Sequence, residues 1–399
     1  MAACLLLLWD PQNAIEGGLQ GLRIFGEIVL PSLLPFFVVA ELLIGLGVVH
    51  FIGALVEPLM RPLFNVPGTG SFVWSMGLAA GYPMDAVITA KLRNAGDCTR
   101  VEGERLLAFT NTADPLFLLG AVAVGMFGLP ALGFHIAAAH YISAILVGLI
   151  FRFHGRSETA LPRGHRERQE LQSRHRQEPV EQAPSGYLAY AFYELRRARR
   201  QDGRDFGRLL ADAMADSTAT LLKICGFIMF FASLIQLMNT TGMMAVLGWP
   251  VRFLLKGLGW EPDLTPGLLA GVLELDVGAA MTAGISAPLV QRLAVVSAIV
   301  AWSGLSVHGQ VASIVATTDL RLGAYIKARL LHAALAAGLA MLLFYVKPPF
   351  ASAALTTATG AVITATFFPY FRYILAMAFT GVGVLGGAVC YLAGKRKAG

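Results

Sequence analysis

Two polar segments interrupt strongly apolar sequence, one in each half of the chain. The first reads AFTNTADP at residues 108–115 and comes after the tripeptide Gly81-Tyr82-Pro83. The second reads AWSGLSVHGQ at residues 301–310, begins 193 residues after the first, and comes after Glu274-Leu275-Asp276. Polar, Gly- and Pro-interrupted segments at matching places in two membrane-embedded halves indicate the binding site of a transporter. The chemistry predicted for these residues is therefore the binding of a small polar solute.

The candidate residues differ in what they offer a solute. A charge at the bilayer centre costs at least ~2.5–3.5 kcal/mol on insertion scales, so a membrane carboxylate usually faces a cavity or a partner. Asp114, just before Pro115, is placed to cap a new half-helix. Asp85 could bind substrate at the first segment or lie in water near a helix end. Ser303, Ser306 and Gln310 share one helix face, and His308 lies off that face. The predicted substrate-binding residues are Gly81, Tyr82, Pro83, Thr110, Asn111, Thr112, Asp114, Glu274, Asp276, Ser303, Ser306 and Gln310.

A coupling cation is the only bound ion that the sequence suggests. Unwound backbone beside Asn111, Thr112 and Asp114 would offer the oxygen ligands that Na⁺ prefers in transporters. The residues leave Na⁺ coupling, H⁺ coupling and facilitated diffusion open. We expect no other cofactor.

The elements that position these residues are predicted to be membrane helices. Apolar residues make up 56% of the 399 residues and charged residues only 14%, against roughly 45–50% and about 25% in soluble domains. A helix needs about 20 apolar residues to cross the bilayer. Segments near that length are residues 24–48, 106–127, 132–151, 218–238, 293–315, 324–346 and 371–392, whereas Met1–Trp9 is only half a span.

Charge is concentrated between the two halves. Residues 152–208 carry 13 Arg and 8 Asp or Glu, with a helix predicted in their later part. Basic residues mark cytoplasmic loops, which predicts a cytoplasmic linker and C-terminus and places Arg321, Lys327 and Arg329 at a cytoplasmic turn. The predicted divisions are a first membrane repeat at 1–151, the charged linker at 152–208, a second membrane repeat at 209–346, and a C-terminal transmembrane helix with a basic tail at 347–399.

Tracing the crossings from the cytoplasmic linker gives the two halves opposite orientations. The region 70–92 is predicted to dip in from the cytoplasm and the region 266–288 from outside, each as a re-entrant hairpin. Non-helical backbone survives at membrane depth only where protein or a wet cavity surrounds it. The predicted fold is therefore an all-α polytopic membrane protein with two inverted repeats, each with a re-entrant helical hairpin and an interrupted transmembrane helix.

Other function classes lack their signatures. The four cysteines are isolated, without CxxC spacing. The sequence contains neither the phosphate-binding loop of an ATP-driven pump nor a G-x-S-x-G nucleophile element. Acidic residues are interspersed in the Arg-rich linker, which disfavours nucleic-acid binding. We therefore expect no enzyme activity and no nucleic-acid partner; the lipid bilayer is the expected surrounding.

The sequence resembles the YlbJ (SpoVV) family of sporulation integral membrane proteins. The resemblance covers nearly the whole chain apart from the linker and termini. Its motifs are PSLLPFF at 31–37, ELLIG at 41–45, EPLMRPLF at 57–64, GYP at 81–83, FTN at 109–111, PLF at 115–117 and WSGLS at 302–306. The family carries two gate (nucleoside-recognition) domains, which are similar to the hairpin-containing core of concentrative nucleoside transporters. Met84-Asp85 after GYP departs from the family pattern.

The resemblance implies transport of dipicolinic acid out of the mother cell across the outer forespore membrane. It implies that the residues at 81–83 and 110–114 form one half of the substrate site, and that Glu274, Asp276, Ser303 and Ser306 form the other. Relatives by fold often work as homo-oligomers. Three alternatives stay open: a nucleoside transporter, a transporter of another small solute, and a structural component of a sporulation membrane complex.

Overall fold

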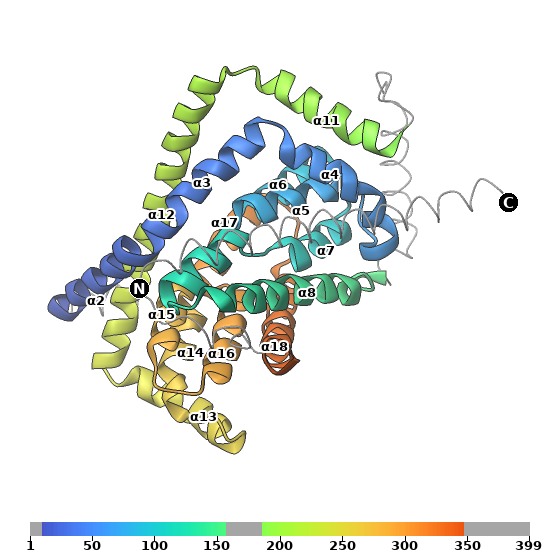
Figure 1. Cartoon of the computed structure of the whole chain (residues 1–399). Coiled ribbons are helices and arrows are strands. Elements are labelled where there is room, and N and C mark those ends of the chain that lie inside the picture. Colours follow the sequence, from blue (N-terminus) through green and yellow to red (C-terminus); the bar gives the residue numbers. More distant parts are fainter. Residues whose placement is uncertain (1–9, 157–185, 347–399) are drawn as a thin grey trace.

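The computed structural model describes residues 10–156 and 186–346, and every regular element in these ranges is a helix (Figure 1). The first half contains α2 (Pro11–Ile24), η1 (Phe25–Val29), α3 (Leu30–Gly45), α4 (Val48–Leu59), η2 (Met60–Phe64), α5 (Gly70–Ala80), α6 (Met84–Ala95), α7 (Arg100–Thr110), η3 (Phe117–Met126), η4 (Pro130–Leu132) and α8 (Gly133–Phe151). The second half contains α11 (Tyr187–Asp202), α12 (Phe206–Thr240), α13 (Met243–Gly257), η5 (Pro262–Leu264), α14 (Thr265–Leu273), α15 (Leu275–Gly284), α16 (Leu289–Trp302), α17 (Gly304–Val315) and α18 (Leu322–Val346).

The order of elements is the same in both halves. A long helix (α3 or α12) is followed by a shorter helix (α4 or α13) and by a pair of short helices (α5–α6 or α14–α15). An interrupted helix (α7–η3 or α16–α17) and a further long helix (α8 or α18) complete each half. The two halves therefore share an order of elements, and the division into two membrane repeats at the predicted bounds stays a prediction.

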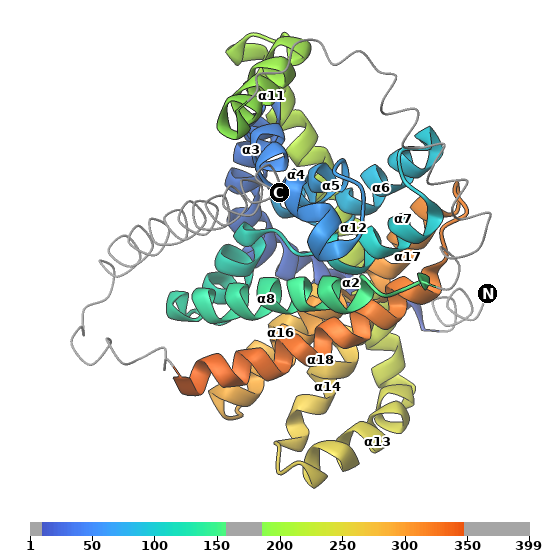
Figure 2. The same cartoon turned by 90° about the vertical axis from the view of Figure 1, so that its right-hand side faces the viewer.

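Equivalent helices run in opposite directions. A Cβ on Gly17 in α2 would lie 2.6 Å from Gln236 near the end of α12, whereas one on Gly45 at the end of α3 would lie 2.3 Å from Leu209 near the start of α12. The α2–α3 segment is therefore antiparallel to α12, and glycines at the contact allow close packing of the two backbones. Helices α4 and α13 lie at opposite ends of the molecule (Figures 1 and 2). Inverted repeats would give this antiparallel arrangement; the inverted repeats and their orientation in a membrane stay predictions.

Within residues 10–156 and 186–346, four helices are long and apolar enough to cross a membrane: Pro130–Phe151, Phe206–Thr240, Leu289–Val315 and Leu322–Val346. The pair Pro11–Val29 and Leu33–Gly45, bent by 56°, raises the number of such spans to five. The predicted span at 106–127 is instead two shorter helices with non-helical backbone between them. The predicted span at 371–392 and the segment Met1–Trp9 lie outside the described residues.

Local signals position the helices that carry the polar segments. Helix α7 begins at a capping box, in which the Thr99 side chain accepts from the Glu102 amide and Glu102 reaches back to Thr99. Helix α6 ends at Gly96, whose φ of +78° suits glycine. Helices α8, α16 and α18 run side by side beneath these segments (Figure 2) and bury apolar faces against one another.

The described part of the linker is more than a solvated connection. Its predicted helix is present as α11, which packs along α4. Ala191 is fully buried there, and the rings of Phe51 and Phe192 lie 5.0 Å apart. The Tyr187 hydroxyl also donates to the Leu55 carbonyl. The linker therefore holds the start of the second half against the first.

Candidate functional site

Both hairpin tips, the first helix interruption and the first turns of α17 meet around one cavity. Its polar lining comes from both halves: Tyr82 and Asp114 from the first, and Glu274, Asp276, Ser306 and Gln310 from the second. The cavity has a volume of about 70 Å³ and is partly open to the outside. Its other walls are apolar and include the rings of Phe37, Phe117 and Phe227. The structure thus brings together six of the residues that the sequence predicts to bind substrate.

The first interruption faces the cavity through Asp114. Its Oδ1 atom accepts from the Leu116 amide at 3.0 Å and from the Phe117 amide at 2.8 Å. The carboxylate therefore caps the helix that starts after Pro115, as the sequence predicts. Gly81 lies against it with φ +64°, and a Cβ at this position would be 3.0 Å from Asp114 Oδ2. Only glycine fits the hairpin tip at this point without strain.

The Tyr82 side chain joins the first tip to the second half. Its hydroxyl donates to the Val300 carbonyl of α16 at 2.8 Å, and the Tyr82–Pro83 peptide bond is cis. Pro83 forms the start of α6 and is not among the cavity-lining residues. The tip is thereby anchored two residues before the end of α16.

Three predicted site residues of the first half point away from the cavity. The Asn111 side-chain amide donates to Asp85 Oδ1 at 2.9 Å, and the Thr110 hydroxyl lies 3.4 Å from Asp85 Oδ2. Asn111 Oδ1 accepts from the Tyr325 hydroxyl at 3.1 Å. Thr110, Asn111 and Thr112 are buried but do not line the cavity. The Thr110 and Asn111 side chains therefore hold Asp85, and the Thr112 hydroxyl lies 3.4 Å from the Thr110 carbonyl.

The second interruption is a single residue. Ser303 adopts φ +70° between α16 and α17. A Cβ on the next residue, Gly304, would lie 3.2 Å from the Glu274 Cα atom. Glu274 accepts from the Val277 amide at 2.8 Å, which caps α15, and the Ser306 hydroxyl also hydrogen-bonds to Glu274. Ser303 itself is fully buried and hydrogen-bonds to Tyr325. It supports the site without lining the cavity.

Asp276 is the least satisfied polar group of the site. Its side chain is buried, and its Oδ1 atom has no hydrogen-bond partner among the described residues. It lies at the cavity beside Glu274, which carries the same charge when both are ionised. A buried carboxylate in this position requires a ligand, a proton or a cation to offset the cost of burial.

Arg329 is a component of the site that the sequence interpretation missed. The prediction that it lies at a cytoplasmic turn was wrong: it is fully buried, seven residues into α18. Its guanidinium donates to the carbonyls of Ala108 at 2.6 Å and Asn111 at 2.5 Å. The positive-inside rule treated it as one more loop charge, although its place inside an apolar span was a signal for a buried role.

Two histidines and a tyrosine complete the support of the first interruption. His140 Nε2 accepts from the Ala113 amide at 3.0 Å, and the Tyr141 hydroxyl donates to the Ala113 carbonyl at 2.9 Å. His332 Nε2 lies 2.9 Å from the His140 carbonyl, and its Nδ1 lies 3.0 Å from Arg329. His308 has a packing role on the other side, with its Nδ1 2.7 Å from the Gly304 carbonyl.

The charges at the cavity are of one sign. Asp114, Glu274 and Asp276 line it, and its lining within the described ranges includes no lysine or arginine. The described residues also hold no group of three His, Cys, Asp or Glu side chains suited to a metal ion. The arrangement suits a solute with aromatic or apolar surface that brings a proton or other positive charge with it.

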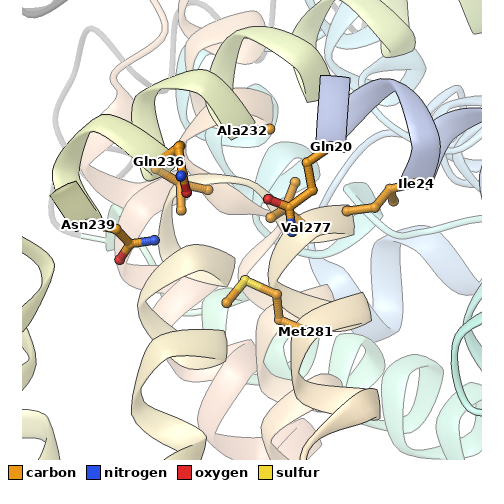
Figure 3. Close-up of a pocket in the computed structure, with 8 residues that line it drawn as sticks. Gln20, Ile24, Ala232, Gln236, Asn239, Val277 and Met281 are labelled. Atoms are coloured by element: carbon orange, nitrogen blue, oxygen red, sulfur yellow. The ribbon is translucent and has the colours of Figure 1, made fainter. Parts of the chain in front are cut away.

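A second pocket lies between α2, α12 and α15 (Figure 3). Gln20 of α2 and Gln236 and Asn239 of α12 surround it, and Val277 and Met281 of α15 form its floor. Its polar groups are neutral carboxamides. Because it contains neither a hairpin tip nor a helix interruption, we regard the first cavity as the candidate site.

Comparison with known proteins agrees with this architecture. A family model described as Gate, nucleoside recognition, matches residues 27–151. The chain is also 40% identical to the sporulation integral membrane protein YlbJ of Bacillus subtilis (strain 168), over 84% of this chain and 78% of that protein. The chain belongs to the YlbJ family. As a YlbJ-family protein with several apolar spans it is an integral membrane protein, and its Gate domain points to a transporter-like role. No solved structure matches the chain.

Proposed function

We propose that this protein is a secondary transporter of a small organic anion, with dipicolinate as the preferred substrate. The observation that carries the proposal is the cavity at which both hairpin tips, the first helix interruption and the start of α17 converge. A site built from two antiparallel repeats can open to either side by rocking one repeat against the other. Phe37, Tyr82 and Phe117 line the cavity and supply aromatic surface against which an aromatic solute can pack.

Dipicolinate carries two carboxylates, which helix N-termini bind well. At this cavity the N-terminal amides are already occupied: Asp114 caps the helix after Pro115, and Glu274 caps α15. The free N-termini that we expected as anion sites are therefore closed by the protein's own acids. An incoming carboxylate can take these amides if the capping side chain becomes protonated and withdraws.

This exchange predicts that a proton travels with the substrate. Among the described residues, the cavity lining holds three carboxylates and no basic residue, so a dianion entering without protons would meet uncompensated repulsion. Proton uptake by Asp114, Glu274 or Asp276 removes that repulsion. H⁺ coupling is therefore our preferred choice among the three mechanisms that the sequence leaves open.

Proteoliposomes that contain the purified protein test the proposal. Uptake of labelled dipicolinate should saturate, increase with an inward proton gradient, and exceed the uptake of labelled uridine. Protein-free liposomes give the background. Saturable uridine uptake with no dipicolinate uptake would replace the substrate by a nucleoside, which the Gate domain keeps as the second candidate. No uptake of either in any gradient would favour a structural role in a membrane complex.

The proposed location is the outer forespore membrane, with the linker 152–208 and the C-terminus on the mother-cell side. The membership in a family of sporulation membrane proteins supports this location. Protease accessibility of the linker in forespores, compared with that of a tag on an extracellular loop, checks the orientation.

A further inference from the structure

The Arg329 guanidinium is a buried cation without an acidic partner. The residue lies fully buried within α18, about 10 Å along the helix from its first residue. The described chain gives it no salt bridge to an aspartate or glutamate. Such a charge is costly to bury unless other groups of negative character surround it.

Backbone carbonyls at two helix ends supply that negative character. The guanidinium donates to Ala108 and Asn111 at the end of α7, and it lies 3.4 Å from the Ala301 carbonyl at the end of α16. The C-terminal end of a helix carries a partial negative charge. Arg329 therefore joins the negative ends of both interrupted helices, one from each half of the chain.

Interrupted helices of secondary transporters bind Na⁺ in a similar environment. There, unwound carbonyls and half-helix C-terminal ends coordinate the ion. Here the carbonyl of Asn111, the first residue after α7, points at the guanidinium instead. Asp85 does not pair with Arg329 directly, because the Asn111 amide holds it at 2.9 Å, but it lies close enough to feel the Arg329 charge.

We propose that Arg329 is a tethered cation that fills the ion position between the two interruptions. The protein then needs no Na⁺ there, and the cation expected near Asn111, Thr112 and Asp114 is replaced by a side chain. Arg329 acts as a positioning residue, because it fixes both interruptions in register and touches no cavity surface. What this inference implies for ion coupling rests on the proposed transport function. The placement of Arg329 at the ion position does not rest on it.

Melting temperatures of the purified full-length protein in detergent test this position. Arg329→Ala should lower the melting temperature by more than about 5 °C, because three carbonyl acceptors lose a charged donor. Low-millimolar guanidinium should recover part of this loss, whereas equimolar choline should not. Lys327→Ala removes an exposed charge from the same helix and should change little and show no recovery. Wild-type protein should melt at the same temperature in NaCl and in choline chloride.

Arg329→Lys covers the case in which the alanine variant does not fold. The lysine ammonium keeps the charge but lacks the planar guanidinium fork. The melting temperature of Arg329→Lys should therefore lie between those of wild type and Arg329→Ala. If Arg329→Ala does not fold, Arg329→Lys should have the highest melting temperature of the Arg329 variants that fold. Equal melting temperatures for Arg329→Ala and Lys327→Ala would overturn the proposal. A wild-type melting temperature that rises in NaCl relative to choline chloride, or an alanine variant that guanidinium does not recover, would also overturn it. Since every readout is a melting temperature, the result is independent of whether transport is observed.

Discussion

The two helix interruptions follow one plan but differ in how their polar groups are satisfied. The first extends over residues 111–114, and Arg329, Tyr325, His140 and Tyr141 all bond to it. The second is Ser303 alone, and the nearby Asp276 has an oxygen without a partner among the described residues. Side chains of α8 and α18 bond to the first interruption, whereas an acid beside the second has a buried oxygen without a partner among the described residues.

This difference suggests that the first interruption forms a rigid frame for the site and that the second hairpin responds to the ligand. Hydrogen bonds from two neighbouring helices restrict the movement of the first interruption. The α14–α15 hairpin, with Glu274 and Asp276 near its tip, has groups that can change partners when a proton or a solute arrives. We therefore expect the first half to hold the site in place and the second half to respond to the ligand.

The close packing of the second hairpin gives the largest expected effect. A Cβ on Gly278 would lie 2.1 Å from the Gly271 backbone, so Gly278→Ala must separate α14 from α15. We expect a loss of about 3 kcal/mol or more in the free energy of unfolding. Gly284→Ala, at the end of the same helix with nothing within 4 Å, should stay within about 0.5 kcal/mol of wild type. Thermal unfolding in detergent measures both, and equal melting temperatures would show that the hairpin is not closely packed.

The first interruption should be sensitive to loss of a single amide. Asn111→Leu removes the donor to Asp85 and the acceptor of Tyr325. The buried Asp85 carboxylate then lacks its amide hydrogen bond. The expected cost is about 3 kcal/mol. Asn239→Leu, at an exposed position, is the matched control. If the two variants unfold at the same temperature, the first interruption is not the frame that we describe.

The second interruption should tolerate the corresponding change. Asp276→Asn removes a buried charge that lacks a full set of partners, so its stability should stay within about 1 kcal/mol of wild type or rise. Its response to substrate should be lost, seen as no shift in melting temperature when dipicolinate is added. A destabilisation as large as that of Asn111→Leu would remove the distinction between the two halves.

The smallest effect is expected at the contact between the halves outside the membrane core. Arg93 Nε lies 2.7 Å from Asp319 Oδ1, and this hydrogen bond lowers the pKa of Asp319. A lowered folded-state pKa stabilises the protein above the unfolded value, and that contribution disappears as the pH falls through the folded value. Because Asp319 is half exposed, Asp319→Asn should cost less than about 1 kcal/mol at pH 7.

A pH series of melting temperatures checks this contact. The difference between wild type and Asp319→Asn should be present at neutral pH and should shrink toward zero in strong acid. A difference that grows as the pH falls would contradict the assignment.

Local patterns in the sequence were enough for the helices and for part of the site. Apolar runs indicated the spans, Pro115 and Asp114 indicated a capped half-helix, and matching polar segments indicated that Glu274 and Asp276 belong with Asp114. These features depend on neighbouring residues along the chain, so sequence spacing reports them directly.

The other features of the site depend on contacts between helices that are distant in the sequence. Whether Asn111 faces the cavity or Asp85 depends on how α6 packs against α7, which no spacing within one segment reveals. Arg329 reaches both interruptions only because α18 lies beside α7 and α16. A rule that counts basic residues by side of the membrane could not distinguish it from the loop charges nearby.

Uptake of labelled dipicolinate into proteoliposomes, measured for acids on both walls of the cavity, tests the central claim most directly. Asp114→Asn and Glu274→Gln remove one carboxylate from each half, and Asp263→Asn removes an exposed acid just before the second hairpin. With equal amounts of folded protein, the two cavity variants should each lose at least about tenfold in uptake rate, equivalent to ~1.4 kcal/mol, and Asp263→Asn should match wild type. Wild-type uptake by both cavity variants would contradict the claim that the convergent cavity is the transport site.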